Sequence, residues 1–150
     1  MSLPSKFNIR VYGLLINEHN EILISDEQQN DFRFSKFPGG GLEFGEGPED
    51  CVIREFKEEL DIEIQIKKHY YTTGFFQQSA FFKDHQIISI YYMVSSEHCL
   101  NISTVKTRFE NLAEKGQVFR WARIGEINLE ELNFPIDQLV AGKINNEYYS

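Results

Sequence analysis

A glycine-rich turn that leads into a proline-initiated helix is the feature that most constrains this chain. The Pro-Gly-Gly-Gly run at 38–41 allows backbone conformations that other residues resist. Gly47-Pro48 then places proline in a first helical turn, and the acidic Glu49-Asp50 pair suits the positive end of a helix dipole. Apolar residues recur at helical spacing as far as Leu60. The sequence therefore predicts a helix over 47–60 that follows a tight backbone turn.

Strand patterns surround this helix on both sides. Apolar alternation and β-branched content predict strands over 8–16, 21–25, 62–66, 86–94 and 117–123, and helical spacing predicts a short helix over 136–144. We expect the first two strands to form a hairpin, the polar stretch 26–36 to be a loop, and 70–76 to extend the strand at 62–66. The nearly unbroken apolar run at 86–94 is typical of a central strand buried on both faces. These elements predict one α/β sandwich domain over residues 1–150.

Charge and composition limit the partners. The chain of 150 residues carries 15 basic and 23 acidic residues, a net charge of −8, which argues against binding a nucleic-acid duplex. A small phosphorylated substrate is compatible with this charge when divalent cations lie between it and an acidic site. No apolar run reaches the roughly 18 residues of a membrane helix, and the first residues lack the apolar core of a secretory signal. We therefore expect no membrane partner.

The cysteines indicate a protein of a reducing compartment, and the histidines do not indicate a zinc site. Two cysteines, Cys51 and Cys99, do not make a disulfide framework in a domain of this size. The four histidines are scattered and lack the spacing of zinc ligands. The cytoplasm is the expected location.

Three glutamates on the predicted helix form the candidate chemical site. Glu55, Glu58 and Glu59 are three and four residues apart, so their side chains share one face. Carboxylates crowded there repel one another, and hard cations such as Mg²⁺ prefer carboxylate oxygens as ligands. A solvated helix face is the alternative from the helix alone. The glycine-rich turn favours a binding site, and Glu46 can pair with Arg54 to pin the loop to the helix.

The residues from Gly40 to Ile62 resemble the Nudix box, the signature of the Nudix hydrolases. Gly40 is followed after five residues by Glu46 and, after seven more, by the run Arg54-Glu55-Phe56-Lys57-Glu58-Glu59-Leu60-Asp61-Ile62. Asp61 stands where the family has the glycine that ends the helix, a position at which a left-handed conformation is expected. We expect a local stability cost there rather than lost activity. The resemblance implies an α/β/α sandwich with a mixed β-sheet.

The resemblance also implies roles for single residues. Glu55, Glu58 and Glu59 take the positions of the family's catalytic, metal-binding glutamates, and the Gly39 carbonyl takes the position of a further ligand to the metal. Arg54 matches the arginine that orients the glutamates. Glu46 and Gly40 have structural roles. The implied cofactor is Mg²⁺, for which Mn²⁺ can substitute, and the implied reaction is hydrolysis of a diphosphate linkage.

One more acidic ligand is expected from a loop beyond the box. Glu114 is the first candidate for this metal-binding and catalytic role, and Glu110 is the second, with a solvated loop charge as the alternative for either. The general base that accepts a proton from water stays open among Glu55, Glu59 and Glu114.

Residues outside the box select the substrate within the family. Gln77 and Gln78 stand where many ADP-ribose hydrolases have a proline, and tags of other branches are missing. The resemblance therefore favours a MutT-like enzyme that acts on a nucleoside triphosphate. A nucleotide-sugar or ADP-ribose pyrophosphatase and a non-catalytic nucleotide sensor are the alternatives. The expected partner is a small nucleotide, and a homodimer stays open.

A few residues are candidates for contact with the nucleotide. Asp137 lies near the position of a base-contacting residue in MutT-like enzymes, and a helix cap is its alternative role. The aromatic residues that could stack on a base, with a place in the core as their alternative, are Tyr12, Phe34, Phe75 and Phe76.

Overall fold

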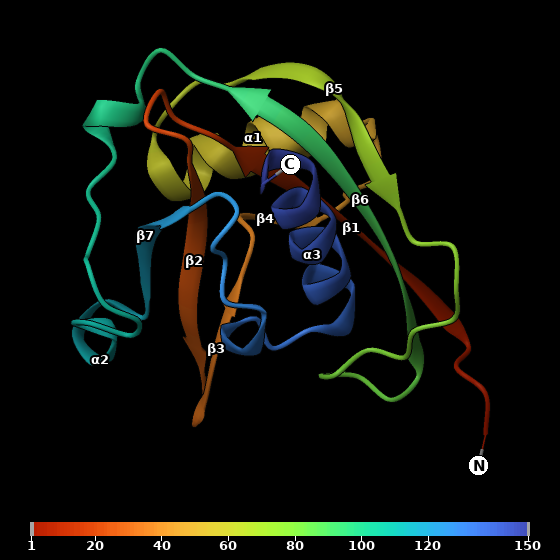
Figure 1. The fold of residues 1–150 in the computed structure, drawn as a ribbon. Helices are drawn as coiled ribbons and strands as arrows, with labels where there is room; N and C mark the ends of the chain where they lie inside the picture. Colours follow the sequence, from red (N-terminus) through yellow and green to blue (C-terminus); the bar gives the residue numbers. More distant parts are fainter. Residues whose placement is uncertain (1, 150) are drawn as a thin grey trace.

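The computed structural model describes residues 2–149, which form two β-sheets with helices packed around them (Figure 1). The strands are β1 Lys6–Leu15, β2 Glu21–Gln29, β3 Phe32–Lys36, β4 Gly39–Gly41, β5 Gln65–Thr72, β6 His85–Ser95 and β7 Gln117–Arg123. The helices are α1 Pro48–Leu60, α2 Leu112–Lys115 and α3 Pro135–Tyr149, with 3₁₀ turns at Cys99–Asn101 and Leu129–Glu131. Among residues 2–149, no helix has both the length and the apolar character needed to cross a membrane.

The larger sheet is mixed and has the strand order β4-β1-β6-β5. Strands β1 and β6 run parallel, with Tyr12 opposite Tyr91, whereas β4 and β5 are antiparallel to their neighbours. The smaller sheet is antiparallel, with the order β3-β2-β7. Strand β6 therefore lies inside its sheet between β1 and β5, as the apolar run at 86–94 predicts.

Both faces of the mixed sheet are covered by a helix (Figure 1). One core forms against α1 and includes Val11, Leu15, Val52, Phe56 and Val94. The other forms against α3 and includes Tyr12, Leu14, Tyr91, Val140 and Ile144. Residues of β1 alternate between the two cores because successive side chains of a strand point to opposite faces. The predicted α/β/α sandwich with a mixed sheet is therefore confirmed.

The hairpin expected from 8–16 and 21–25 does not form. Strands β1 and β2 belong to different sheets and meet at the isolated bridge between Ile16 and Ile22. The reason is that β4 and β6 occupy the two edges of β1, which leaves no edge for β2. Strand β2 pairs with β3 and β7 instead.

The loop expected over 26–36 is also wrong, because these residues continue β2 and form β3. A turn at Asn30, which has a positive φ of 56°, joins the two strands. The polar composition hides the strands because the polar side chains have buried partners. The wholly buried Asp26 accepts hydrogen bonds from the Ser35 hydroxyl at 2.7 Å and from Nε of Arg120 at 2.9 Å. A buried carboxylate with such donors stabilises a sheet that alternation alone does not reveal.

The remaining elements follow the sequence closely. Strand β5 begins at Gln65 instead of residue 62 and reaches Thr72. Ile62 and Ile64 are nevertheless buried, at 3% and 6% exposure, so the apolar alternation there reports burial ahead of the strand. Strand β7 has the expected bounds, and α3 extends the helix expected at 136–144 to Pro135–Tyr149.

Helix α1 begins and ends where the sequence signals place it. Pro48 lies in the first turn, and the Asp50 carboxylate accepts a hydrogen bond from the Gly47 backbone N–H at 3.1 Å. At the other end, Asp61 has φ 53° and ψ 37°, and its N–H donates to the Lys57 carbonyl at 3.0 Å. The left-handed conformation expected for Asp61 is confirmed.

We expect Asp61→Gly to raise the free energy of unfolding by a few tenths to about 1 kcal/mol, because glycine adopts this conformation without a steric cost. The loss of the exposed Lys57–Asp61 ion pair at 2.9 Å offsets only a small part of that gain, because solvent screens exposed charges. Urea unfolding measures the change. Asp61→Ala, which loses the same ion pair but keeps the strain, is the matched control and should be less stable than the wild type. Turnover should stay almost unchanged, and a large activity gain in the glycine variant would contradict this expectation.

Candidate active site

Helix α1 carries the three predicted glutamates beside its buried face. Val52 and Phe56 are fully buried and anchor the helix on the mixed sheet. The Glu55 side chain is 14% exposed and that of Glu58 is 59% exposed, while Glu59 is partly buried. The three carboxylates therefore lie on one helix, and Glu58 is the most open to solvent.

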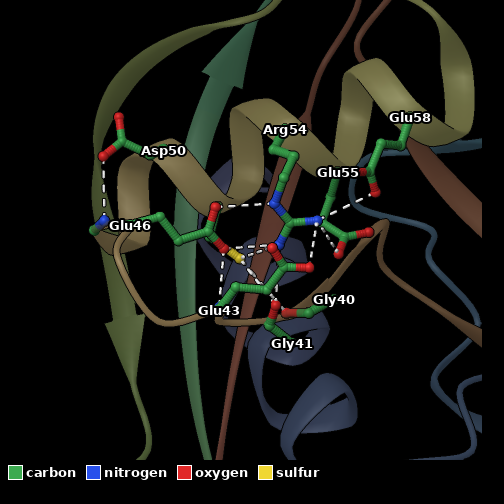
Figure 2. Close-up of polar contacts among 10 residues, drawn as sticks. Gly40, Gly41, Glu43, Glu46, Asp50, Arg54, Glu55 and Glu58 are labelled. Carbon is green, nitrogen blue, oxygen red and sulfur yellow. Dashed lines mark hydrogen bonds and ion pairs between the residues drawn. The ribbon is translucent and has the colours of Figure 1, made fainter.

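Arg54 and Glu46 form the ion pair that the sequence predicts (Figure 2). Nε and one terminal nitrogen of Arg54 donate to the two carboxylate oxygens of Glu46 at 2.9 and 2.7 Å. The same terminal nitrogen donates to the Gly41 carbonyl at 3.1 Å. The hydrogen bond from Arg54 is the main cause that lowers the pKa of Glu46 to about 2, and its counterpart raises the pKa of Arg54. The pair pins the loop after β4 to α1.

The other terminal nitrogen of Arg54 draws two of the helix carboxylates together. It donates to Glu55 and to Glu58 at 3.1 Å each, and the carboxylate of Glu43 lies 3.7 Å away. One guanidinium thus faces the carboxylates of Glu43, Glu46, Glu55 and Glu58 (Figure 2). This arrangement offsets part of the repulsion among the crowded acids.

Glu59 lies outside this network and is the unbalanced acid of the site. Its Oε2 atom is buried and has no hydrogen-bond partner within the described part of the chain. Burial raises the pKa of Glu59 to about 7; Lys36 and the Gln117 side chain act against this rise, whereas Glu27 and Glu55 add to it. A buried carboxylate oxygen without a donor is costly until a proton or a cation compensates it.

The donor atoms suit a hard divalent cation, although they do not converge on one point. The three glutamates and the Gly39 carbonyl offer oxygen ligands of the kind that Mg²⁺ prefers. Among residues 2–149, no three Asp, Glu, His or Cys side chains are placed to hold a metal ion. Arg54 engages two of the glutamates, and the Lys36 ammonium donates to the Gly39 carbonyl at 3.2 Å. The unpartnered oxygen of Glu59 is the observation that fits a role as a ligand to such a cation.

The glycines of β4 let the backbone lie close to its neighbours. Gly39 has φ +151°, and a Cβ atom there would lie 2.1 Å from the Val11 carbonyl oxygen. A Cβ atom on Gly40 would lie 2.4 Å from a carboxylate oxygen of Glu55. Strand β4 therefore has no room for side chains at these two positions, and the Gly40 position leaves the space that Glu55 fills.

The two candidates for an additional acidic ligand are not joined to the glutamates of α1. Glu114 is exposed on α2, and no hydrogen bond or ion pair in residues 2–149 links it to them. The Glu110 carboxylate accepts hydrogen bonds from the hydroxyl and the backbone N–H of Thr107, which lower its pKa, so it serves its own loop. Besides Glu55, the acid whose charge acts on Glu59 is Glu27 on β2. Sequence reasoning missed Glu27 because its segment resembles a loop.

Lys36 is a second residue that the sequence did not single out. It is only 5% exposed, and its ammonium lies 3.0 Å from a Glu27 carboxylate oxygen and 3.2 Å from the carbonyls of Phe37 and Gly39. Burial acts to lower the pKa of Lys36, but Glu27 and Tyr12 act to raise it, and the net direction is upward. Lys36 is therefore a charged and fully partnered cation beside the glutamates.

A cavity of about 280 Å³ lies on the α3 side of the mixed sheet. Its floor is formed by alternate residues of β1 and β6, namely Asn8, Arg10, Tyr12, Ile87, Ser89 and Tyr91. Its walls come from Glu27, Gln29, Phe34 and Lys36, from the loop 77–82, and from residues 134–137 at the start of α3. Of the predicted stacking residues, Tyr12 and Phe34 line the cavity, whereas Phe75 and Phe76 are exposed and do not.

Asp137 is buried at the α3 end of this cavity. It is 2% exposed, and its carboxylate accepts a hydrogen bond from the Tyr91 hydroxyl. Burial raises the pKa of Asp137 to about 6, against the effect of Tyr91, Lys36 and Arg10. The carboxylate thus lies at the cavity wall, where a ligand can reach it.

The chain is similar in sequence to known proteins. The family model of the NUDIX domain matches residues 6–142. The 8-oxo-dGTP diphosphatase of Escherichia coli (strain K12) is 44% identical over 52 residues, which are 33% of this chain and 40% of that protein. The 8-oxo-dGTP diphosphatase of Proteus vulgaris is 35% identical over 54 residues, 35% of this chain and 48% of that protein. The match spans less than half the length of either curated relative.

Among solved structures, the MutT protein of Methanosarcina mazei Go1 superposes with a TM-score of 0.71 at 19% identity. The superposition covers 99% of this chain and 100% of the other. At this identity the likeness shows a shared fold.

Proposed function

The chain belongs to the Nudix family, and from this premise we propose that it hydrolyses nucleoside triphosphates to a monophosphate and pyrophosphate with Mg²⁺ as cofactor. The observation that carries the proposal is that only strand β4 separates the glutamates from the cavity: the Glu55 carboxylate lies against Gly40, and the guanidinium of Arg10, which lines the cavity, lies against Gly41. Arg10 and Glu27 both line the cavity. The charge of Glu55 raises the pKa of Arg10, and the charge of Glu27 raises the pKa of Glu59. A nucleotide whose nucleoside part lies in the cavity would thus direct its phosphates toward the carboxylates.

The residues that would hold Mg²⁺, or Mn²⁺ in its place, are Glu55, Glu58 and Glu59 with the Gly39 carbonyl. When bound, such an ion neutralises phosphate oxygens and lowers the pKa of water. Arg54 holds Glu55 and Glu58 in place through its 3.1 Å contacts. A carboxylate of the site then accepts the proton of the attacking water, a contribution of roughly 10²–10⁴-fold.

The nucleoside end of the substrate is proposed to lie against Phe34 and Asp137. Phe34 offers an aromatic ring, and the Asp137 carboxylate can accept a hydrogen bond from an N–H of a base. Because the two curated relatives are 8-oxo-dGTP diphosphatases, 8-oxo-dGTP is the first substrate to test. Cys51 and Cys99 are free thiols, which fits the proposed cytoplasmic location.

A substrate panel in ¹⁸O-labelled water tests the proposal. The panel holds 8-oxo-dGTP, the four deoxynucleoside triphosphates, ADP-ribose and nucleotide sugars, each with Mg²⁺ and with chelator, and products are resolved chromatographically. We expect a triphosphate to give a monophosphate and pyrophosphate only with Mg²⁺, with label in a phosphate product. Label in a released free sugar would refute attack at phosphorus.

The same panel separates the alternatives. Nucleotide sugars or ADP-ribose cleaved with a kcat/KM well above that of every triphosphate would replace the proposed substrate class. Tight nucleotide binding without turnover of any compound would favour the non-catalytic sensor. Full activity in the presence of chelator would contradict the proposed metal dependence.

A further inference from the structure

Arg10 is a cation in the floor of the cavity. Asn8, Arg10 and Tyr12 are alternate residues of β1, and all three line the cavity. The intervening Val11 is buried in the core against α1. Arg10 is opposite Gly41 on β4 and Ser89 on β6. Its guanidinium therefore lies on the cavity face of the sheet, next to the strand that adjoins the glutamates.

The orientation of this guanidinium is fixed while its terminal nitrogens are not engaged. Nε of Arg10 donates to the Tyr12 hydroxyl at 2.9 Å. Tyr12 is 7% exposed, and its ring stacks on that of Tyr91 with a centroid separation of 5.1 Å. Neither terminal nitrogen of Arg10 has a hydrogen bond or ion pair to any of residues 2–149. A buried tyrosine thus aims two parallel N–H donors that have no protein acceptor.

The other cations of this region, the buried Arg120 and Lys36 and the half-buried Arg54, are matched by acceptors. Nε of Arg120 binds Asp26 at 2.9 Å and a terminal nitrogen binds Glu131 at 3.1 Å. Arg54 and Lys36 are saturated by the carboxylates and carbonyls described above. Arg10 differs because Glu27 and Glu55 act on it only at a distance. Burial, the largest single effect, acts to lower the pKa of Arg10, but Tyr12, Glu27 and Glu55 together raise it, and the net direction is upward. Among the described residues that line the cavity, Arg10 is the cation with donors left for a ligand.

The free donors have the chemistry of a phosphate-binding group. A guanidinium presents paired N–H donors in a planar fork that matches two oxygens of a phosphate. Asp137 lies at the α3 end of the cavity, and Glu55 acts on Arg10 from the side of α1. A phosphate on Arg10 would lie between these two ends, where a nucleotide has the phosphate attached to its sugar.

We propose that the terminal nitrogens of Arg10 bind the phosphate nearest the nucleoside, and that Arg10 thereby selects nucleotides over nucleosides. This proposal rests on the function proposed above and names the residue that reads the phosphate. Lys36 does not take this role, because Glu27 and two carbonyl oxygens already accept its hydrogen bonds.

Binding of monophosphates and nucleosides, measured by calorimetry on protein in the presence of a chelator, tests the proposal without turnover. The probes are 8-oxo-dGMP and the four deoxynucleoside monophosphates, each paired with its nucleoside. We expect the wild type to bind at least one monophosphate more tightly than its nucleoside. Arg10→Gln should reduce that preference roughly 10- to 100-fold, the usual worth of hydrogen bonds to a charged group, and leave nucleoside affinity unchanged.

Two further variants control the experiment. Arg33→Gln removes the same charge from an exposed arginine outside the cavity lining and should keep the full preference. Arg10→Lys keeps the charge but loses the fork, so its preference should lie between those of wild type and Arg10→Gln. If Arg10→Gln does not fold, a wild-type preference in Arg10→Lys overturns the proposal.

The outcomes separate this proposal from the proposed function. Full preference in a folded Arg10→Gln variant, with triphosphate hydrolysis intact in the wild type, overturns the phosphate contact alone. Equal wild-type affinity for every monophosphate and its nucleoside also overturns it. A wild type that neither binds nor hydrolyses any nucleotide overturns both.

Discussion

Glu59→Gln should lower turnover by at least about 10²-fold and at the same time make the protein more stable at pH 8. Both effects come from the same carboxylate. Glu59 has a buried oxygen without a donor and a pKa raised to about 7. Its charge serves a cation when one is bound, and destabilises the folded chain when none is. Glutamine removes that charge while keeping the shape of the side chain.

The stability gain has a defined pH window. The pKa of Glu59 rises from 4.5 to about 7 on folding, so the folded state binds the proton more tightly than the unfolded state. Stability therefore falls as pH rises from about 4.5 to about 7 and is level above that. The variant lacks this loss, and its advantage over wild type should grow from near zero at pH 5 to about 1–3 kcal/mol at pH 8. Urea unfolding of both proteins in the presence of a chelator, at several pH values, measures the difference in their free energies of unfolding.

Two matched variants and added metal test the assignment. Glu63→Gln changes an exposed glutamate beyond the helix and should alter neither turnover nor stability. Glu58→Gln should lower turnover by a similar factor without the stability gain, because Glu58 is exposed and paired with Arg54. Mg²⁺ should raise the melting temperature of wild type more than that of Glu59→Gln. A ligand stabilises the native state according to how tightly it binds that state, and the variant lacks one of the proposed metal-binding carboxylates. Equal stability of wild type and Glu59→Gln at pH 8 would contradict the unbalanced charge.

Gly39→Ala and Gly40→Ala should fail in different ways although the residues are neighbours. At Gly39 the added carbon meets the Val11 carbonyl at 2.1 Å in a backbone conformation that favours glycine. Since backbone cannot move aside cheaply, we expect a loss of about 2–4 kcal/mol in stability. At Gly40 the added carbon meets the end of the Glu55 side chain at 2.4 Å. That side chain can rotate away, so stability should change by less than about 1 kcal/mol while turnover falls about 10²-fold.

Gly41→Ala is the control for this pair. A carbon added there has the Arg10 guanidinium as its nearest neighbour, at an ordinary 3.7 Å, and should change stability and turnover little. Melting curves and steady-state kinetics of the three variants measured side by side give the comparison. An active Gly40→Ala enzyme would show that Glu55 does not need the position it occupies beside β4.

The sequence predicts the parts of this molecule that local chemistry determines. Pro48 and the acidic first turn place the start of α1, and the Arg54–Glu46 pair follows from residues close along the chain. The parallel pairing of β1 with β6, which sets Tyr12 opposite Tyr91, joins distant segments. A hairpin between neighbouring strands is the usual expectation from a single sequence, and here it was wrong because β1 has no free edge.

The residues that were missed are single charges within strands. Glu27 and Lys36 form a buried ion pair at 3.0 Å, yet each belongs to a polar stretch that resembles a loop. Arg10 lies in the strand that begins with Lys6 and Asn8 and then becomes apolar, and the one available signal was its alternation with Asn8 and Tyr12. Alternation assigns these three to one face, but only the fold shows that this face forms a cavity floor.

The mixed sheet separates the two tasks of the proposed enzyme. The carboxylates belong to α1 on one face, and the cavity lies on the other face under α3; the two sides meet along the side-chain-free strand β4. Substitutions in the cavity floor therefore need not disturb the packing of α1. Because of this separation, substrate specificity can change during evolution through substitutions at Asn8, Ser89 or Phe134, which line the cavity, without changes in the residues of α1.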